Sequence, residues 1–160
     1  PWFEDTIFVL VGDHGKLVGT PECEMPQSYN HVPLMIYGTG IAATHHTEFG
    51  GQIDIAPTLL HLLGIDYTQN NFGMNLLEEQ RPAIFYTADN LIAARDDERL
   101  YIYSPETTQE FCYLTDGATV QRAEFDASFE PLKRYCFAML QSTEWMVRNQ
   151  LTLDHPAQTN

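Results

Sequence analysis

The chain has 160 residues, of which 44% are hydrophobic, enough for one domain with a core of its own. Its net charge of −14 argues against nucleic-acid binding, which depends on Lys and Arg at the phosphates, and against adsorption to an anionic membrane surface. The three cysteines show no zinc-finger or Cys-x-x-Cys spacing, and no apolar run is long enough to span a membrane. We expect buried thiols at Cys112 and Cys136.

The first predicted element is a strand over residues 6–11. These residues are apolar or β-branched without helical spacing, which is typical of a strand buried on both faces, as in a parallel sheet. Asp13 and His14 follow its end, where ligands bind in open α/β sheets. A carboxylate beside an imidazole suits zinc or a similar divalent cation. Gly12 and Gly15 permit the turn that would bring the two side chains together. The alternative is a polar turn in which Asp13 caps the next segment.

Residues 16–31 are predicted to form a loop, since they are rich in Pro, Gly and polar residues. A loop of this length is usually functional or mobile, and we expect it to form a rim or a lid beside Asp13 and His14. His31 ends the loop and is a candidate to contact a substrate ester; the alternative is a surface histidine that precedes the next strand, 32–37. His45 and His46 are expected in an exposed polar loop.

A helix is predicted from Asp54 to Leu63. Asp54 is expected to cap it, Pro57 suits its first turn, and Gly64 ends it. We assign Asp54 a structural role, and we expect its loss to cost about 1 kcal/mol of stability, which is typical of a cap.

The last third of the chain is predicted to contain short strands and one long helix. The expected strands cover 82–87, 90–95, 99–104 and 110–115, and 90–115 is predicted to be an antiparallel meander. Apolar residues at helical spacing predict a helix from about Glu130 to Asn149, with Pro131 in its first turn. Residues 150–160 are expected to be a polar tail.

Three segments carry a family resemblance: Asp13-His14-Gly15, the strand-like run Val32–Gly38, and Gly51–Ile65 with its Gln-Ile-Asp-Ile-Ala-Pro-Thr-Leu-Leu sequence. In this order they resemble the C-terminal half of the sulfatase branch of the alkaline phosphatase superfamily. Within that branch, the chain is most similar to the lipoteichoic acid synthase and phosphoglycerol transferase family. Glu110–Asp116 also resembles a strand of sulfatases. The resemblance is strong over 5–77 and looser after that.

The resemblance implies an α/β fold: a partial alkaline-phosphatase-like sheet with parallel strands, a small antiparallel meander and a long C-terminal helix. Residues 1–80 would belong to the metal-dependent catalytic core, and 81–160 would pack on it. By resemblance, Asp13 and His14 are two ligands of a divalent metal, either Mn²⁺, Zn²⁺ or Mg²⁺, or Ca²⁺ in a true sulfatase. The nucleophile and remaining ligands are expected in an N-terminal half that would complete the enzyme, so no nucleophile is assigned in this chain.

The expected substrate is a phosphate or sulfate ester. Many sulfatases carry a His and a Lys in the loop after Asp-His-Gly, whereas here Lys16 follows Gly15 directly and 17–30 contain neither residue. This favours the phosphoglycerol transferase over the sulfatase. A catalytically silent binding module is the non-enzymatic alternative. The resemblance also implies an extracytoplasmic domain of a membrane-anchored protein.

Overall fold

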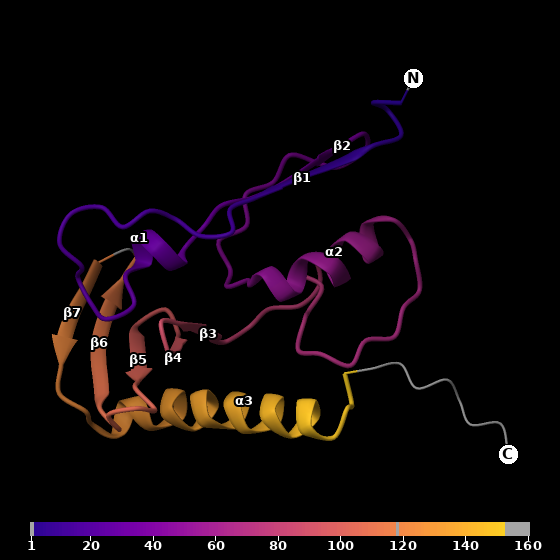
Figure 1. Cartoon of the computed structure of the whole chain (residues 1–160). Helices are drawn as coiled ribbons and strands as arrows, with labels where there is room; N and C mark the ends of the chain where they lie inside the picture. Colours follow the sequence, from indigo (N-terminus) through magenta and orange to yellow (C-terminus); the bar gives the residue numbers. More distant parts are fainter. Residues whose placement is uncertain (1, 118, 153–160) are drawn as a thin grey trace, which may run out of the picture.

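The computed structural model describes residues 2–117 and 119–152, which form two antiparallel sheets and two longer helices (Figure 1). The small sheet pairs β1 (Ile7–Val11) with β2 (Leu34–Gly38). The larger sheet has the order β3-β4-β5-β6-β7, with bounds Ile84–Ala88, Leu91–Arg95, Arg99–Tyr103, Glu110–Asp116 and Thr119–Ala123. The helical elements are α1 (Gln27–Asn30), η1 (Gln52–Asp54), α2 (Ile55–Leu62), η2 (Ala127–Phe129) and α3 (Glu130–Arg148).

The prediction of parallel strands is wrong for the described residues. β1 and β2 run antiparallel, with Val9 opposite Ile36, and all pairs of the larger sheet are antiparallel too. A parallel pair needs a crossover of a dozen or more residues, usually with a helix. Residues 12–33 are long enough for such a crossover, but their one helix is the single turn of α1, and the chain returns alongside β1 in the opposite direction.

The first strand was also expected to be buried on both faces, and this is wrong within the described residues. Leu10 is 52% exposed and Val11 is 44% exposed. The reason is geometric, because among the described residues β1 and β2 pack mainly on each other. In Figure 1 this ribbon extends away from the larger sheet, with α2 lying nearer the middle of the molecule.

The predicted meander over 90–115 is confirmed, and the same sheet also includes β3, which was predicted as a separate strand, and β7, which was not predicted. β7 was missed because Thr119–Ala123 mixes polar and apolar residues without a clear alternation. Gly117 has a φ of +56°, a left-handed conformation that glycine adopts without strain, in the turn before β7. The preceding hairpins turn at 96–98 and 104–109, close to the predicted positions.

The core lies on both faces of the larger sheet, because successive side chains of a strand point to opposite faces. On one face, Ala94 and Tyr101 pack with Phe129, Leu132 and Cys136, which come from η2 and α3. On the other face the buried cluster consists of Cys23, Met25, Ala93, Leu100, Ile102 and Tyr113. The segment that follows the Asp13–His14 turn therefore covers one side of the sheet while α3 covers the other (Figure 1).

The two predicted helices are confirmed with small shifts of their ends. α3 begins at Glu130, has Pro131 in its first turn and ends at Arg148. Within residues 2–117 and 119–152, no helix is both long and apolar enough to cross a lipid bilayer. The predicted tail lies mostly outside the described residues.

Asp54 does not cap α2 as predicted. Its side chain makes no capping hydrogen bond to α2. The carboxylate is fully buried and instead accepts hydrogen bonds from the backbone N–H groups of Gly51 and Met74, both at 2.7 Å, and from the guanidinium of Arg81. A local pattern predicts a local cap, and it cannot reveal partners that lie 20 and 27 residues further along the chain.

Candidate active site

Asp13 and His14 lie together in the turn after β1. The His14 Nε2 atom is 3.8 Å from Asp13 Oδ2, and both side chains are accessible, at 56% and 90% exposed. The backbone N–H of His14 donates to Asp13 Oδ1 at 2.9 Å. This hydrogen bond, followed by the charge of His14, holds the pKa of the Asp13 carboxyl below its usual value. The carboxylate is therefore ionised at neutral pH and open to a ligand.

The backbone fixes which imidazole nitrogen can bind a cation. His14 Nδ1 lies 2.7 Å from the carbonyl oxygen of Gly15. A carbonyl oxygen can only accept a hydrogen bond, so a neutral imidazole carries its proton on Nδ1 here. Its lone pair is then on Nε2, the atom that lies 3.8 Å from Asp13 Oδ2. A second partner of this kind commonly orients the imidazole of a metal-binding histidine.

The separation of the two candidate ligand atoms fits a shared cation. Two ligand atoms at about 2.1 Å from one cation lie about 3.0–4.2 Å apart, depending on the angle between them. The distance of 3.8 Å falls in this range. Within residues 2–117 and 119–152, no group of three His, Cys, Asp or Glu side chains is arranged to hold a metal ion. The donor set therefore fits two positions of a metal site, and the described residues place no third ligand of this kind beside it.

Gly15 allows the turn to lie directly against α1. Its N–H donates to the carbonyl of Tyr29 at 2.7 Å. A Cβ atom at position 15 would lie 2.1 Å from the carbonyl oxygen of Ser28, which is backbone and cannot rotate away. Only glycine fits at this distance. At Gly12, a Cβ would lie 3.2 Å from the Val32 side chain and at an ordinary contact distance of 3.6 Å from the His14 carbonyl oxygen.

Sequence reasoning missed two residues that hold the turn. The Tyr29 ring stacks on the His14 imidazole, with centroids 5.0 Å apart and an interplanar angle of 19°. On the other side, the Gln52 amide donates to the carbonyl oxygens of Gly12 at 2.8 Å and Asp13 at 3.2 Å. Gln52 lies in the most distinctive segment of the family resemblance, which was a usable signal. Nothing in the sequence pairs Tyr29 with His14.

The other candidate ligands are not brought into this arrangement. His31 is exposed just after α1, where its backbone N–H donates to Gln27. The Glu22 carboxylate accepts from the backbone N–H of Gln27 at 2.8 Å and so holds the start of α1. His45 and His46 lie in an exposed loop, as predicted, and His46 is 3.8 Å from Glu48.

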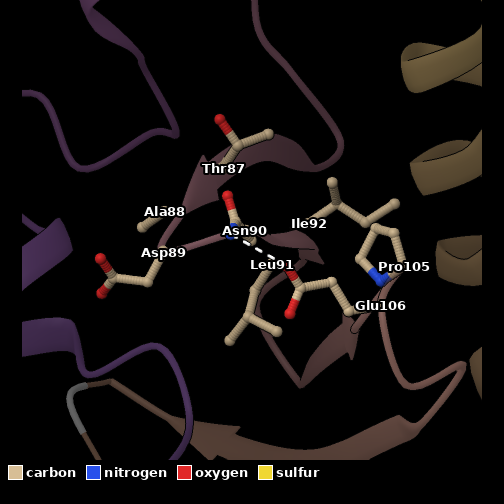
Figure 2. Close-up of a pocket in the computed structure, with 8 residues that line it drawn as sticks. All are labelled: Thr87, Ala88, Asp89, Asn90, Leu91, Ile92, Pro105 and Glu106. Carbon is tan, nitrogen blue, oxygen red and sulfur yellow. Dashed lines mark hydrogen bonds between the residues drawn. The ribbon is translucent and has the colours of Figure 1, made fainter.

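A shallow pocket of about 470 Å³ lies elsewhere, at the hairpin between β3 and β4 (Figure 2). Asp89 and Asn90 form its turn with φ values of +49° and +61°, and Asn90 donates to Glu106 at 3.2 Å. Its lining has carboxylates but no imidazole or thiol, so it does not offer the mixed ligand set of Asp13 and His14.

Comparison with known proteins shows which families and structures this chain resembles. Residues 3–65 match the family model described as Sulfatase. Lipoteichoic acid synthase 1 of Bacillus subtilis is 26% identical over 144 residues, 82% of this chain and 21% of that protein. Arylsulfatase K of Gallus gallus is 28% identical over 145 residues, 79% of this chain and 26% of that protein.

The fold is shared with a solved structure. The crystal structure of a protein in the alkaline phosphatase superfamily from Vibrio parahaemolyticus matches with a TM-score of 0.76 and 22% identity, over 96% of this chain and 38% of that chain. The chain spans about a fifth to a quarter of the length of the two curated relatives named above.

Proposed function

Because the chain belongs to the sulfatase branch of the alkaline phosphatase superfamily, we propose that it is the C-terminal part of a metal-dependent phosphoglycerol transferase or related phosphoester-cleaving enzyme. In this proposal Asp13 and His14 are two of its metal ligands. The observation that carries the proposal is the hydrogen bond from His14 Nδ1 to the Gly15 carbonyl, which leaves the imidazole lone pair on Nε2, the atom that lies 3.8 Å from Asp13 Oδ2.

The chain's own contribution is to present an ionised carboxylate and an imidazole nitrogen in fixed positions. A divalent cation held there, Mn²⁺, Zn²⁺ or Mg²⁺, supplies Lewis-acid polarisation of the ester oxygens. The remaining ligands and the nucleophile come from other parts of the enzyme. His31 is our candidate for a substrate contact, since it lies two residues after Tyr29, which stacks on His14.

The charge of the chain constrains how an anionic ester binds. A net charge of −14 repels a phosphate ester. The basic residue that follows the Asp13–His14 turn directly is Lys16. Binding therefore depends on positive charge from the cation and from the rest of the enzyme.

Exposed apolar side chains on the small sheet support a larger catalytic domain. Leu10 and Met35 are opposite each other on one face of the β1–β2 ribbon, Tyr37 is on the same face, and all three are more than half exposed. Contiguous apolar surface of this kind marks an interface. We propose that the rest of the catalytic domain covers it, and that this domain lies outside the cytoplasmic membrane, as the likeness to lipoteichoic acid synthase implies.

The second candidate is a sulfate-ester hydrolase, which the similarity to arylsulfatase K favours. The two are separated by assaying the full-length enzyme on a glycerophospholipid and on an aryl sulfate. We expect glycerophosphate transfer, and we expect Asp13→Asn and His14→Ala to lower it by about 100-fold or more, since each removes a ligand. His46→Ala is the matched control. Sulfate release without phosphotransfer would reverse the ranking.

The alternative that the chain is a catalytically silent binding module is tested by titrating the chain alone with a metal ion. We expect weak Mn²⁺ binding, because two protein ligands leave most of the coordination shell to water. Tight stoichiometric binding that His14→Ala abolishes would mean that other residues of this chain, such as His31 or Glu22, complete the site.

A further inference from the structure

The Gln52 side chain links η1 to the two peptide groups around Asp13. Its amide has two N–H bonds, and it donates to the carbonyl of Gly12 at 2.8 Å and to that of Asp13 at 3.2 Å. These carbonyls belong to the peptide groups on either side of the Asp13 Cα atom. Holding both therefore restricts the backbone dihedrals that aim the Asp13 carboxylate and the following imidazole.

Gln52 extends from a firmly held base. In η1, the N–H of Gly51 donates to the buried carboxylate of Asp54 at 2.7 Å, and the N–H of Asp54 donates to the Gly51 carbonyl at 2.9 Å. The same carboxylate is bound by Arg81 and by the N–H of Met74. The position of Gln52 is thus set by contacts that are buried, although its own side chain is exposed.

A contact on the other side completes the arrangement. The Gly15 N–H donates to the Tyr29 carbonyl at 2.7 Å, and the Tyr29 ring stacks on His14. The turn is held from η1 on one side and from α1 on the other. Without the η1 side, the turn depends on α1 alone, so Asp13 is free to swing and the His14 imidazole that follows it is held less firmly.

We infer that Gln52 is a positioning residue for the Asp13–His14 pair. The inference rests on the proposed function, because it assigns Gln52 to the geometry of that same site. A purely stabilising role predicts a lower thermal unfolding midpoint in Gln52 variants. A positioning role predicts that this midpoint changes little while the site loses its order, because Gln52 and the turn it holds are exposed and water replaces the lost hydrogen bonds.

The experiment uses the 160-residue chain labelled with ¹⁵N-histidine and compares Gln52→Glu and Gln52→Ala with the wild type. Glu keeps the size of the side chain but has no N–H to donate, and Ala removes the group without adding charge. Gln141→Glu, on the exposed face of α3, is the charge-matched control. The His14 imidazole signals, assigned by their loss in His14→Ala, report the ring stacking and the protonated nitrogen. Titration with MnCl₂ then gives the affinity for the metal alone.

In the wild type we expect His14 signals shifted by the Tyr29 ring, with the proton on Nδ1. Both Gln52 variants should move these signals toward those of a free histidine and weaken Mn²⁺ binding about tenfold, the usual effect of losing a residue that orients a ligand. Unchanged His14 signals in both variants would overturn the inference. If the wild type binds no Mn²⁺ at all, the proposal that Asp13 and His14 are metal ligands is contradicted. The His14 signals still decide the role of Gln52.

Discussion

Arg81 lies against Asp54 in a contact from which water is excluded, with the two side chains 8% and 0% exposed. Arg81 Nε donates to Asp54 Oδ2 at 3.1 Å, and its Nη2 also donates to the Phe72 carbonyl at 2.6 Å. With the backbone N–H groups of Gly51 and Met74, each oxygen of Asp54 has two donors. This carboxylate therefore joins η1, the loop around residue 73 and the segment before β3.

Removing the charge of Asp54 should be costly. Asp54→Asn leaves the Arg81 guanidinium buried without a counter-charge, and breaking such a pair costs about 3–5 kcal/mol. We expect a loss of this size in the free energy of unfolding, measured with urea, rather than the ~1 kcal/mol of a helix cap. Asp66→Asn, in an exposed loop, should change it by less than about 0.5 kcal/mol. Equal losses in the two variants would contradict the role given to the pair.

The helices and strands were easier to predict from the sequence than the segments that they contact. The strands and α3 have local patterns, such as Pro131 at the start of α3, and these were found close to their observed positions. The direction of β1 relative to β2 was not predictable from an apolar run, because such a run indicates burial and carries no information on what buries it. The prediction that Asp54 caps a helix was wrong for a similar reason, because its main partner, Arg81, is distant in sequence.

The candidate site was predictable in part for the same reason. Asp13 and His14 are adjacent, so the sequence alone places them together. Their support by Gln52 and Tyr29 depends on how three separate segments pack, and the family resemblance marked only the segment that contains Gln52. Whether Asp13 and His14 bind a metal stays a prediction.

A methyl group at position 15 should separate the turn from α1. Gly15→Ala would place a Cβ 2.1 Å from the Ser28 carbonyl oxygen, so the backbone must move, and we expect a loss of about 1–3 kcal/mol in the free energy of unfolding. The Tyr29–His14 stacking should be lost with it, as seen in the His14 proton signals. Gly12→Ala is the matched control, because its Cβ would lie no nearer than 3.2 Å to any neighbouring atom and 3.6 Å from the nearest backbone oxygen. A Gly15→Ala protein with intact stacking would be inconsistent with this packing.

The three thiols should be unreactive in the folded chain. Burial raises the pKa of Cys23 and Cys112 to about 11 and that of Cys136 to about 12, and the thiolate is the reactive form. A shift of two pKa units lowers the thiolate fraction about 100-fold, before any steric protection. A thiol reagent at pH 8 should therefore label none of the three quickly in buffer and all of them in urea. Rapid labelling of one folded thiol would contradict its burial.

The same shifts predict how stability depends on alkaline pH. In the unfolded chain the thiols lose their protons near pH 9, whereas in the folded chain they keep them to about pH 11–12. Between these values the folded state binds more protons, so the free energy of unfolding falls as pH rises. Below pH 9 the contribution is fully present. Urea titrations from pH 8 to 11 on the wild type and Cys136→Ala should show a weaker pH dependence in the variant.

Arg95 connects the larger sheet to α1 without a carboxylate partner among the described residues. It lies buried at the end of β4 and donates to the Gln27 side chain and to the Gly117 carbonyl. Gln27 in turn donates to the Tyr86 hydroxyl at 3.2 Å. Because both acceptors of Arg95 are neutral, removing its charge leaves no opposite charge behind in the interior.

Arg95→Met should therefore loosen α1 without the large loss expected for Asp54→Asn. Methionine keeps much of the apolar stem, and losing hydrogen bonds from a charged donor to neutral acceptors should cost about 1–3 kcal/mol. Backbone amides of α1 and His31 should exchange with deuterium faster, while those of β5 and β6 stay protected. Arg148→Met, at the exposed end of α3, removes the same charge and should leave α1 unchanged. If Arg95→Met leaves the α1 amides as protected as in the wild type, then Cys23 and Met25, packed on the sheet beside them, are sufficient to hold α1 in place.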